Sequence, residues 1–236
     1  PQVAQAVEQL RDELTRARAL ITAGRYTDAR PLLDDLHARV GPLEYPPVEA
    51  EILEQRAHLA DLQGEFPRAV EDATRAYELA LVAGSTVVAV ESVATLLFVT
   101  GVRQSNLEVG RTWASSALAL ARRVDPGGAK EGMILNGLGM LAYRAGDFVG
   151  ATAYFERALP IIIAATGEEH DLVANSLNHL GAMLDEQGRY REAEPHFRRA
   201  LAIQTAVFGA EHPRRTSSMD NLALSLQGQG RNADAR

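Results

Sequence analysis

The chain has 236 residues and a formal net charge of −7, with 24 Lys and Arg against 31 Asp and Glu. An apolar fraction of 46% is enough for a continuous core, which excludes a disordered chain. The acidic balance excludes the basic face that nucleic-acid binding requires. Because Cys is absent, disulfides and thiolate chemistry are excluded as well.

The first two predicted elements are helical hairpins over about residues 10–43 and 50–86. Leu14 and Leu53 mark the apolar faces of their first helices, and Gly24 and Gly64 end those helices in turns. The second helices carry apolar and small residues at helical spacing: Tyr26, Ala29, Leu33 and Leu36 in the first hairpin, and Phe66, Ala69, Ala73 and Ala76 in the second.

The stretch 90–128 is predicted to form a third hairpin of less regular sequence. Leu107, Gly110 and Ala117 mark its second helix, and the single Trp113 lies there. Its first helix fits the common template at either Leu96-Leu97 or Leu97-Phe98, so two registers one residue apart remain open. We expect Trp113 to be buried between repeats or to serve as a stacking anchor for a ligand.

The fourth and fifth predicted hairpins, over 132–173 and 174–215, repeat each other with an offset of 42 residues. Leu138-Gly139 recurs as Leu180-Gly181, and the linker Gly-x-x-His recurs as 167–170 and 209–212. Four more residues pair at the same offset: Phe155 with Phe197, and Ala158 with Ala200. A fixed period of this length indicates stacked supersecondary units rather than a single closed core.

A last helix is predicted within the partial repeat 216–236, through Met219, Leu222, Ala223 and Leu226. Its partner helix would start near Asn232. We therefore expect Leu222 and Leu226 to lack cover, so that this helix either frays or contacts another molecule through that face, with self-association as one form of such contact. The chain begins with Pro rather than Met, and we expect it to be part of a longer protein.

These units resemble tetratricopeptide (TPR) repeats. The family places Leu-Gly in the first helix, an aromatic residue after the turn and small residues in the second helix. Leu180-Gly181, Tyr190, Ala193 and Ala200 match that pattern. The resemblance implies an all-α fold, an α-α superhelix or TPR solenoid. It would contain five helical hairpins plus one unpaired terminal helix in a single array over 1–236.

The 42-residue unit with its Gly-x-x-His linker resembles the repeats of kinesin light chains. The segments 17–26 and 103–114 are similar to the TPR region that follows the kinase domain in bacterial serine/threonine protein kinases. That resemblance implies a sensor or docking segment of a signalling protein. The chain itself has no Gly-rich phosphate loop, His-Arg-Asp loop or Asp-Phe-Gly motif, so we expect no enzymatic activity from it.

The family pattern also implies which first-helix positions face the groove where partners bind. The candidate groove residues in the last three first helices are Asn136, Met140, Tyr143, Asn175, Asn178, Asp185, Asp220 and Asn221. Asn136, Asn178 and Asp220 follow one another at 42-residue steps. They either form a polar ladder for the backbone of an extended peptide or are simply tolerated on a solvated helix face. A carboxylate clamp is not expected, because these positions lack Lys.

Neither a metal nor a cofactor is expected. His170 and His212 precede predicted helix starts, and capping or loop packing accounts for them better than metal ligation, which needs converging ligands. Gly137-x-Gly139 follows no predicted strand, which argues against a dinucleotide site. The longest apolar run, 81–99, is interrupted by Gly84 and Glu91, so we expect no membrane insertion.

Two functions remain open. In the first, the groove binds a protein or peptide partner. In the second, the array docks on a domain of its own parent chain, such as a kinase or a transcription-regulating NTPase. A cytoplasmic location is the default expectation. An extracytoplasmic one follows if the parent protein has a membrane span before this region.

Overall fold

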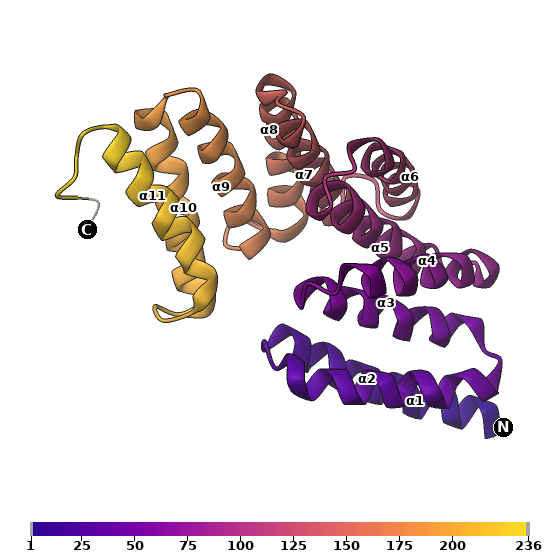
Figure 1. The fold of residues 1–236 in the computed structure, drawn as a ribbon. Helices are drawn as coiled ribbons and strands as arrows, with labels where there is room; N and C mark the ends of the chain where they lie inside the picture. The colour runs from indigo at the N-terminus through magenta and orange to yellow at the C-terminus, as the bar shows by residue number, and fades with distance from the viewer. Residues whose placement is uncertain (1, 235–236) are drawn as a thin grey trace. The chain divides into compact units, whose positions relative to one another are not determined.

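The computed structural model describes residues 2–234, which form eleven α-helices and no strand (Figure 1). The all-α prediction is therefore confirmed. Contacts divide the chain into two compact units, Pro1–Val124 and Asp125–Arg236, and each is described by itself below.

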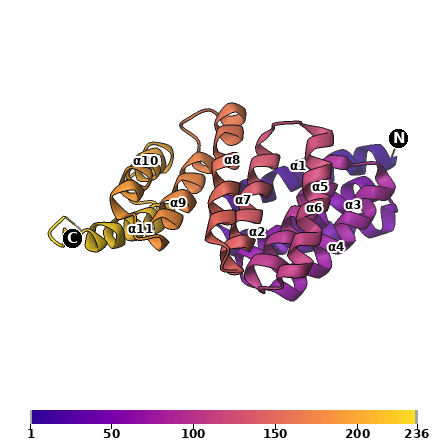
Figure 2. The same ribbon diagram turned by 90° about the horizontal axis from the view of Figure 1, so that it is seen from above.

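The first unit holds three hairpins, numbered 1–3 in chain order. Their elements are α1 (Gln2–Thr22), α2 (Tyr26–Val40), a short 3-10 helix η1 (Gly41–Leu43), α3 (Pro46–Leu62), α4 (Phe66–Ala83), α5 (Thr86–Leu96), the π-helix η2 (Leu97–Arg103) and α6 (Leu107–Val124). Figure 2 shows the hairpins of this unit from above.

The second unit holds hairpins 4 and 5 and a terminal helix. Its elements are α7 (Ala129–Arg144), α8 (Phe148–Thr166), α9 (Asp171–Glu186), α10 (Tyr190–Phe208), a 3-10 helix η3 (Pro213–Arg215) and α11 (Thr216–Gly228). Five hairpins and a further helix thus agree with the predicted sequence of elements.

The turn inside most hairpins is the same left-handed glycine turn. Gly24, Gly64, Gly146 and Gly188 have φ between 72° and 77°. The next residue donates its N–H to the carbonyl five residues earlier, as from Arg189 to Leu184 at 2.9 Å. This satisfies a carbonyl that the end of the first helix would otherwise leave unpaired.

Hairpin 3 closes this turn differently. Ser105, with φ of 58°, stands where the other hairpins have Gly. The N–H of Asn106 bonds the carbonyl of Thr100, six residues earlier rather than five. Hairpin 3 therefore contains one residue more than the template, and the π-helix η2 accommodates it because π-helices arise where one residue is inserted into a helix.

Burial decides between the two registers left open for hairpin 3. Six buried positions of α5 and η2 lie 84 residues before six buried positions of α9: Ala89, Val90, Ser92, Val93, Leu96 and Leu97 match Val173, Ala174, Ser176, Leu177, Leu180 and Gly181. The matching residues of α6 and α10, such as Ala114 and Phe197, are only 83 apart. Leu96-Leu97 therefore occupies the Leu-Gly position.

A close approach of helices within hairpins 4 and 5 explains their Leu-Gly pairs. A Cβ on Gly139 would lie 2.5 Å from Phe155, and one on Gly181 would lie 2.6 Å from Phe197. Only Gly fits beneath these rings, since interiors are close-packed. The equivalent residue in α11 is Ala223, 42 residues after Gly181.

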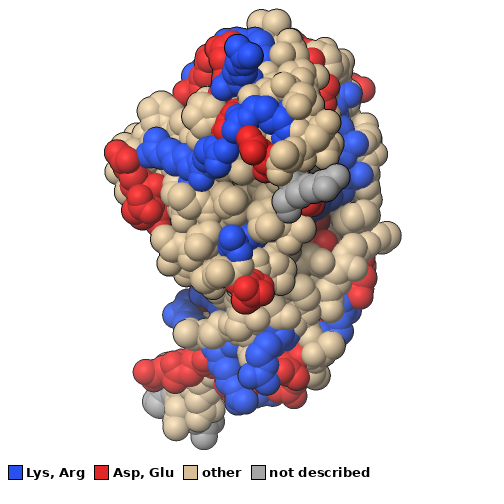
Figure 3. Space-filling view, turned by 90° about the vertical axis from the view of Figure 1, so that its left-hand side faces the viewer, with Lys and Arg blue, Asp and Glu red and all other residues tan. Residues whose placement is uncertain are grey.

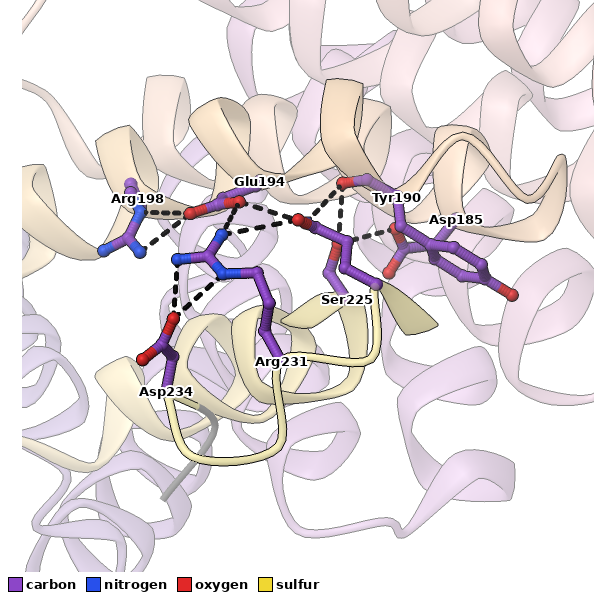
Figure 4. A network of polar contacts seen from close by, with 8 residues as sticks. Asp185, Tyr190, Glu194, Arg198, Ser225, Arg231 and Asp234 are labelled. Atoms are coloured by element: carbon purple, nitrogen blue, oxygen red, sulfur yellow. Dashed lines mark hydrogen bonds and ion pairs between the residues drawn. The ribbon is translucent and has the colours of Figure 1, made fainter. Parts of the chain in front are cut away.

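The terminal helix α11 and the residues just after it are held by polar contacts to hairpin 5 (Figure 4). Gln229 Nε2 donates to the carbonyl of Tyr190 at 3.2 Å, and Glu194 accepts from Gln229, Arg198 and Arg231. Leu226 is 2% exposed and Leu222 is partly buried. The expectation that Leu226 lacks cover is therefore wrong, because α11 packs against α10 and α9.

Two helical segments, Thr86–Arg103 and Phe148–Thr166, are long and apolar enough to cross a membrane by length and composition. The sequence pattern predicted no such run. In the structure 61% of the first segment and 22% of the second is buried. Core helices of soluble proteins pass the same criterion, so this finding assigns no membrane role.

Candidate functional site

The first helices of the second unit, α7, α9 and α11, are joined by one repeated side-chain contact. Asn136 Nδ2 donates to Ser176 Oγ at 2.8 Å, and Asn178 Nδ2 donates to Ser218 Oγ at 2.6 Å. In each case the serine lies 40 residues after the asparagine. These three helices therefore lie next to one another and form one face, which we call the first-helix face.

The sequence pattern predicted that the two asparagines would be exposed on that face. In the structure both are buried. Asn136 and Asn178 are each 7% exposed, and the Oδ1 atom of each is buried without a hydrogen-bond partner in the described part of the chain. Both side chains point between helices because a serine hydroxyl of the next repeat is within reach. They fix the spacing of first helices, and the exposed ladder is a wrong prediction for these two residues.

Two further candidates also make contacts between repeats. Tyr143 Oη donates to Glu186 Oε1 at 3.0 Å, and this hydrogen bond raises the pKa of Tyr143. Asp185 Oδ1 lies 3.0 Å from Ser225 Oγ, and burial raises the pKa of the Asp185 carboxyl. Each residue retains some exposure, so it can also contact a partner.

The remaining candidates differ in exposure. Met140 is partly buried in the cluster around Phe155 and Met183. Asn221 is partly buried, and Asp220 is exposed. Asn175 and Asp220 come together in one pocket of the first-helix face, whose other lining residues are Asp171, Gln204, Pro213, Arg214, Thr216 and Ser217.

Sequence reasoning missed three residues that shape this pocket. Asp171 is 8% exposed and Gln204 is 1% exposed, whereas the Arg214 side chain is 55% exposed. Gln204 lies on the second helix α10, which the groove pattern ignores. Its polar side chain on an otherwise apolar face, where Ile162 stands 42 residues earlier, was the available signal.

The histidines of the two linkers are caps. His170 Nδ1 accepts the N–H of Leu172 at 3.1 Å, and His212 Nδ1 accepts that of Arg214 at 3.2 Å. These bonds satisfy free donors at the start of each helical segment, which confirms the capping interpretation. Among residues 2–234, no three His, Asp or Glu side chains gather in a way that could hold a metal ion.

Trp113 packs against the buried cluster of Ala57, Ala73 and Leu96, with its ring nearly perpendicular to that of Tyr77 at a centroid distance of 6.0 Å. It therefore lies between hairpins 2 and 3, as the interpretation of a repeat-interface residue predicted, but it is partly rather than fully buried. Figure 3 shows Lys and Arg side chains interspersed with Asp and Glu on the face drawn, without one broad basic patch.

Comparison with known families identifies the repeat. Tetratricopeptide repeat patterns match residues 14–85, 131–206 and 172–236. Together these matches span most of the chain, and it belongs to the tetratricopeptide repeat family. The unmatched stretch between residues 85 and 131 contains hairpin 3, the hairpin with the inserted residue. None of the curated sequences compared with the chain matches it.

Several solved structures share the fold. BtubC (BKLC) from P. vanneervenii is 22% identical, with 90% of this chain and 91% of that chain covered and a TM-score of 0.65. NprR in complex with its cognate peptide NprX is 15% identical, with 96% and 64% covered and a TM-score of 0.71.

A third similar structure is a signal transduction ATPase with numerous domains and a tetratricopeptide repeat sensor, from Pyrococcus horikoshii. It is 16% identical, with 91% of this chain and 32% of that chain covered and a TM-score of 0.68. The chain thus spans about a third of that protein. Identities this low show a common fold only, so the ligand has to be inferred from the residues of this chain.

Proposed function

We propose that this chain is a non-catalytic interaction module that binds a peptide on the first-helix face of its second unit. The observation that carries the proposal is the pocket on this face, in which exposed Asp220 and partly buried Asn175 lie beside a buried polar network. Partly buried polar groups with free hydrogen-bonding capacity can bind an extended backbone without any rearrangement of the helices.

A related fold supports the proposal. NprR was solved in complex with a peptide, and its TPR-like fold matches nearly the whole of this chain. In the parent protein, the module would serve as the sensor or docking region of a larger bacterial signalling protein. A serine/threonine kinase is the parent that the sequence resemblance favours.

The second candidate is an intramolecular regulator that docks on its own parent chain. The observation that favours it is the similarity to a signal transduction ATPase whose tetratricopeptide repeats form its sensor. An NTPase or another regulator with a TPR tail would then be the parent protein.

A random peptide library displayed on phage and selected against the immobilised chain tests the first proposal. We expect enriched sequences whose binding is weakened at least about tenfold by the double variant Asn175→Ala, Asp220→Ala, because both residues line the pocket. The matched control is Glu156→Ala, an exposed residue of α8 outside the pocket. No enrichment, or equal weakening by the control, would reject peptide binding on this face.

A further inference from the structure

The pocket on the first-helix face contains a carboxylate that is almost removed from water. Asp171 is the first residue of α9 and is 8% exposed. Its carboxylate offsets the positive end of the helix dipole. A buried carboxylate is nevertheless costly unless a cation or several hydrogen bonds compensate for the lost hydration.

One short bond provides most of that compensation. Arg214 Nη1 lies 2.5 Å from Asp171 Oδ2. The amide donors are at the limit of hydrogen bonding, with Gln204 Nε2 at 3.4 Å and Asn175 Nδ2 at 3.5 Å. The pocket is therefore built around a guanidinium, and that guanidinium belongs to the chain itself.

The guanidinium comes from the surface rather than from the core. The Arg214 side chain is 55% exposed and belongs to the three-residue helix η3. Its other contact is with the ring of Phe208, whose centroid lies 5.2 Å from Cζ. A long exposed side chain loses little when it turns into water, where its charge is well hydrated.

The preceding junction of the unit does without this arrangement. The residues 42 positions before Asp171, Gln204, Phe208 and Arg214 are Ala129, Ile162, Thr166 and Leu172. None of them is charged, yet α7, α8 and α9 pack together in the same way. Stacking therefore does not require the ion pair, which is particular to the last junction.

We propose that this pocket accepts the cationic side chain of an Arg or Lys in a bound peptide, and that Arg214 occupies it when no peptide is bound. The inference rests on the proposed function and names the residue class that the same site selects. Asp171 and Asp220 outnumber Arg214 among the charged residues of the lining, so the pocket attracts a cation. Arg is favoured over Lys because Asp171 already binds a planar guanidinium.

Titration of the ¹⁵N-labelled chain with Nα-acetyl-arginine methylamide, followed by NMR, tests the inference without knowledge of the natural peptide. We expect saturable shifts at the starts of α9 and α11. Arg214→Ala should tighten binding roughly threefold to tenfold, because it removes the internal competitor. The citrulline analogue, which has the same shape without the charge, should cause no shifts there.

Two controls keep the result clear. Arg189→Ala removes an exposed arginine that pairs with Glu192 outside the pocket, and it should leave the affinity unchanged. Asp171→Asn should abolish the shifts, and Asp220→Asn should weaken binding even if the first variant unfolds. Weaker or unchanged binding in Arg214→Ala, or equal binding of the citrulline analogue, would overturn the inference.

The two proposals fail separately. A library that enriches peptides without Arg or Lys, together with no response to the arginine probe, would reject the cation pocket and leave peptide binding standing. An arginine response without any enriched peptide would support the cation pocket and reject peptide binding on this face.

Discussion

Hairpins 3 and 5 solve the same packing problem with opposite side chains. Where the two helices of hairpin 5 cross, Gly181 lies under the ring of Phe197. The equivalent residues of hairpin 3 are Leu97 and Ala114, and both are fully buried. The large side chain has thus moved from the second helix to the first. What the hairpin conserves is the filled volume at the crossing, not the residue at each position.

The turns of the two hairpins also differ, and only that of hairpin 3 departs from the template. Hairpin 5 closes on Gly188, whereas hairpin 3 holds Ser105 in the left-handed region and inserts a residue through η2. A buried, well-filled crossing can therefore sustain a strained connection.

Exchanging the crossing residues should break this comparison most strongly. Phe197→Ala should cost about 3–5 kcal/mol in the free energy of unfolding, since it leaves a large cavity. Gly181→Leu alone should cost at least about 1–3 kcal/mol, because its Cβ would lie 2.6 Å from the Phe197 ring. The double variant, which copies Leu97 and Ala114, should recover part of both losses in urea unfolding followed by circular dichroism.

The free energies of the two single variants provide the reference for that test. If the double variant loses as much as their sum, the residues do not compensate each other, and the equivalence of the two crossings is rejected.

Acid should separate the hairpins next. Hairpin 5 stacks the partly buried His179 on Phe155, with ring centroids 4.9 Å apart, where hairpin 3 has Thr95. Burial lowers the pKa of His179 from 6.5 to about 4. The unfolded chain therefore takes up this proton first, and the His179 contribution to stability is lost as the pH falls from 6.5 toward 4.

That contribution amounts to about 3 kcal/mol at most. The variant His179→Leu, compared with the original chain at neutral pH and at about pH 4.5, should lose correspondingly less stability on acidification. Other groups titrate alike in both proteins and cancel in the difference. An identical acid response of the two proteins would contradict a lowered pKa of His179 in the folded chain.

Removing the contact between first helices sharpens the comparison further. Hairpin 5 has Asn178 at the position where hairpin 3 has Ala94. Asn178→Ala should cost about 1 kcal/mol, because Ser218 loses one hydrogen bond and keeps another to Gln204. Hydrogen exchange of α11 amides should accelerate, whereas Asn221→Ala on the next helix should have little effect. Unchanged exchange would mean that the contact does not hold the helices.

The smallest effect is expected at the turns. Ser105→Gly should stabilise the first unit by about 0.5–1 kcal/mol, since Gly adopts positive φ without Cβ strain. Gly188→Ser should destabilise the second unit by a similar amount. Paired thermal melts of the two variants measure both. Shifts of the same sign would show that φ does not govern these positions.

The order of elements could be read from the sequence because Gly, aromatic and Ala positions recur with the period of the hairpin. The register of hairpin 3 could not be decided from the first helix alone. The inserted residue lies between two stretches that each match the template, so only their different offsets, 84 and 83 residues from hairpin 5, reveal it. The periodicity argument assumes an α-helix of 3.6 residues per turn throughout, whereas η2 is a π-helix.

The candidate site was only partly predictable for a related reason. Helical periodicity gives the direction of a side chain and says nothing of its reach. Asn136 and Asn178 occupy face positions, but a serine 40 residues later draws each one between helices. Asp171 was obscured because its importance depends on Gln204 and Arg214, which lie in two other elements.

Ala223 limits the size of the side chain that a helix packed across α11 can place at this position. In hairpins 4 and 5 the residue at this place is Gly, and each accommodates a phenylalanine ring at a distance that no methyl group could share. The methyl of Ala223 occupies that space beforehand. A helix that crosses α11 as α10 crosses α9 must therefore place an aliphatic or smaller side chain at this point. A phenylalanine fits at the two earlier crossings but would clash with Ala223 at this one.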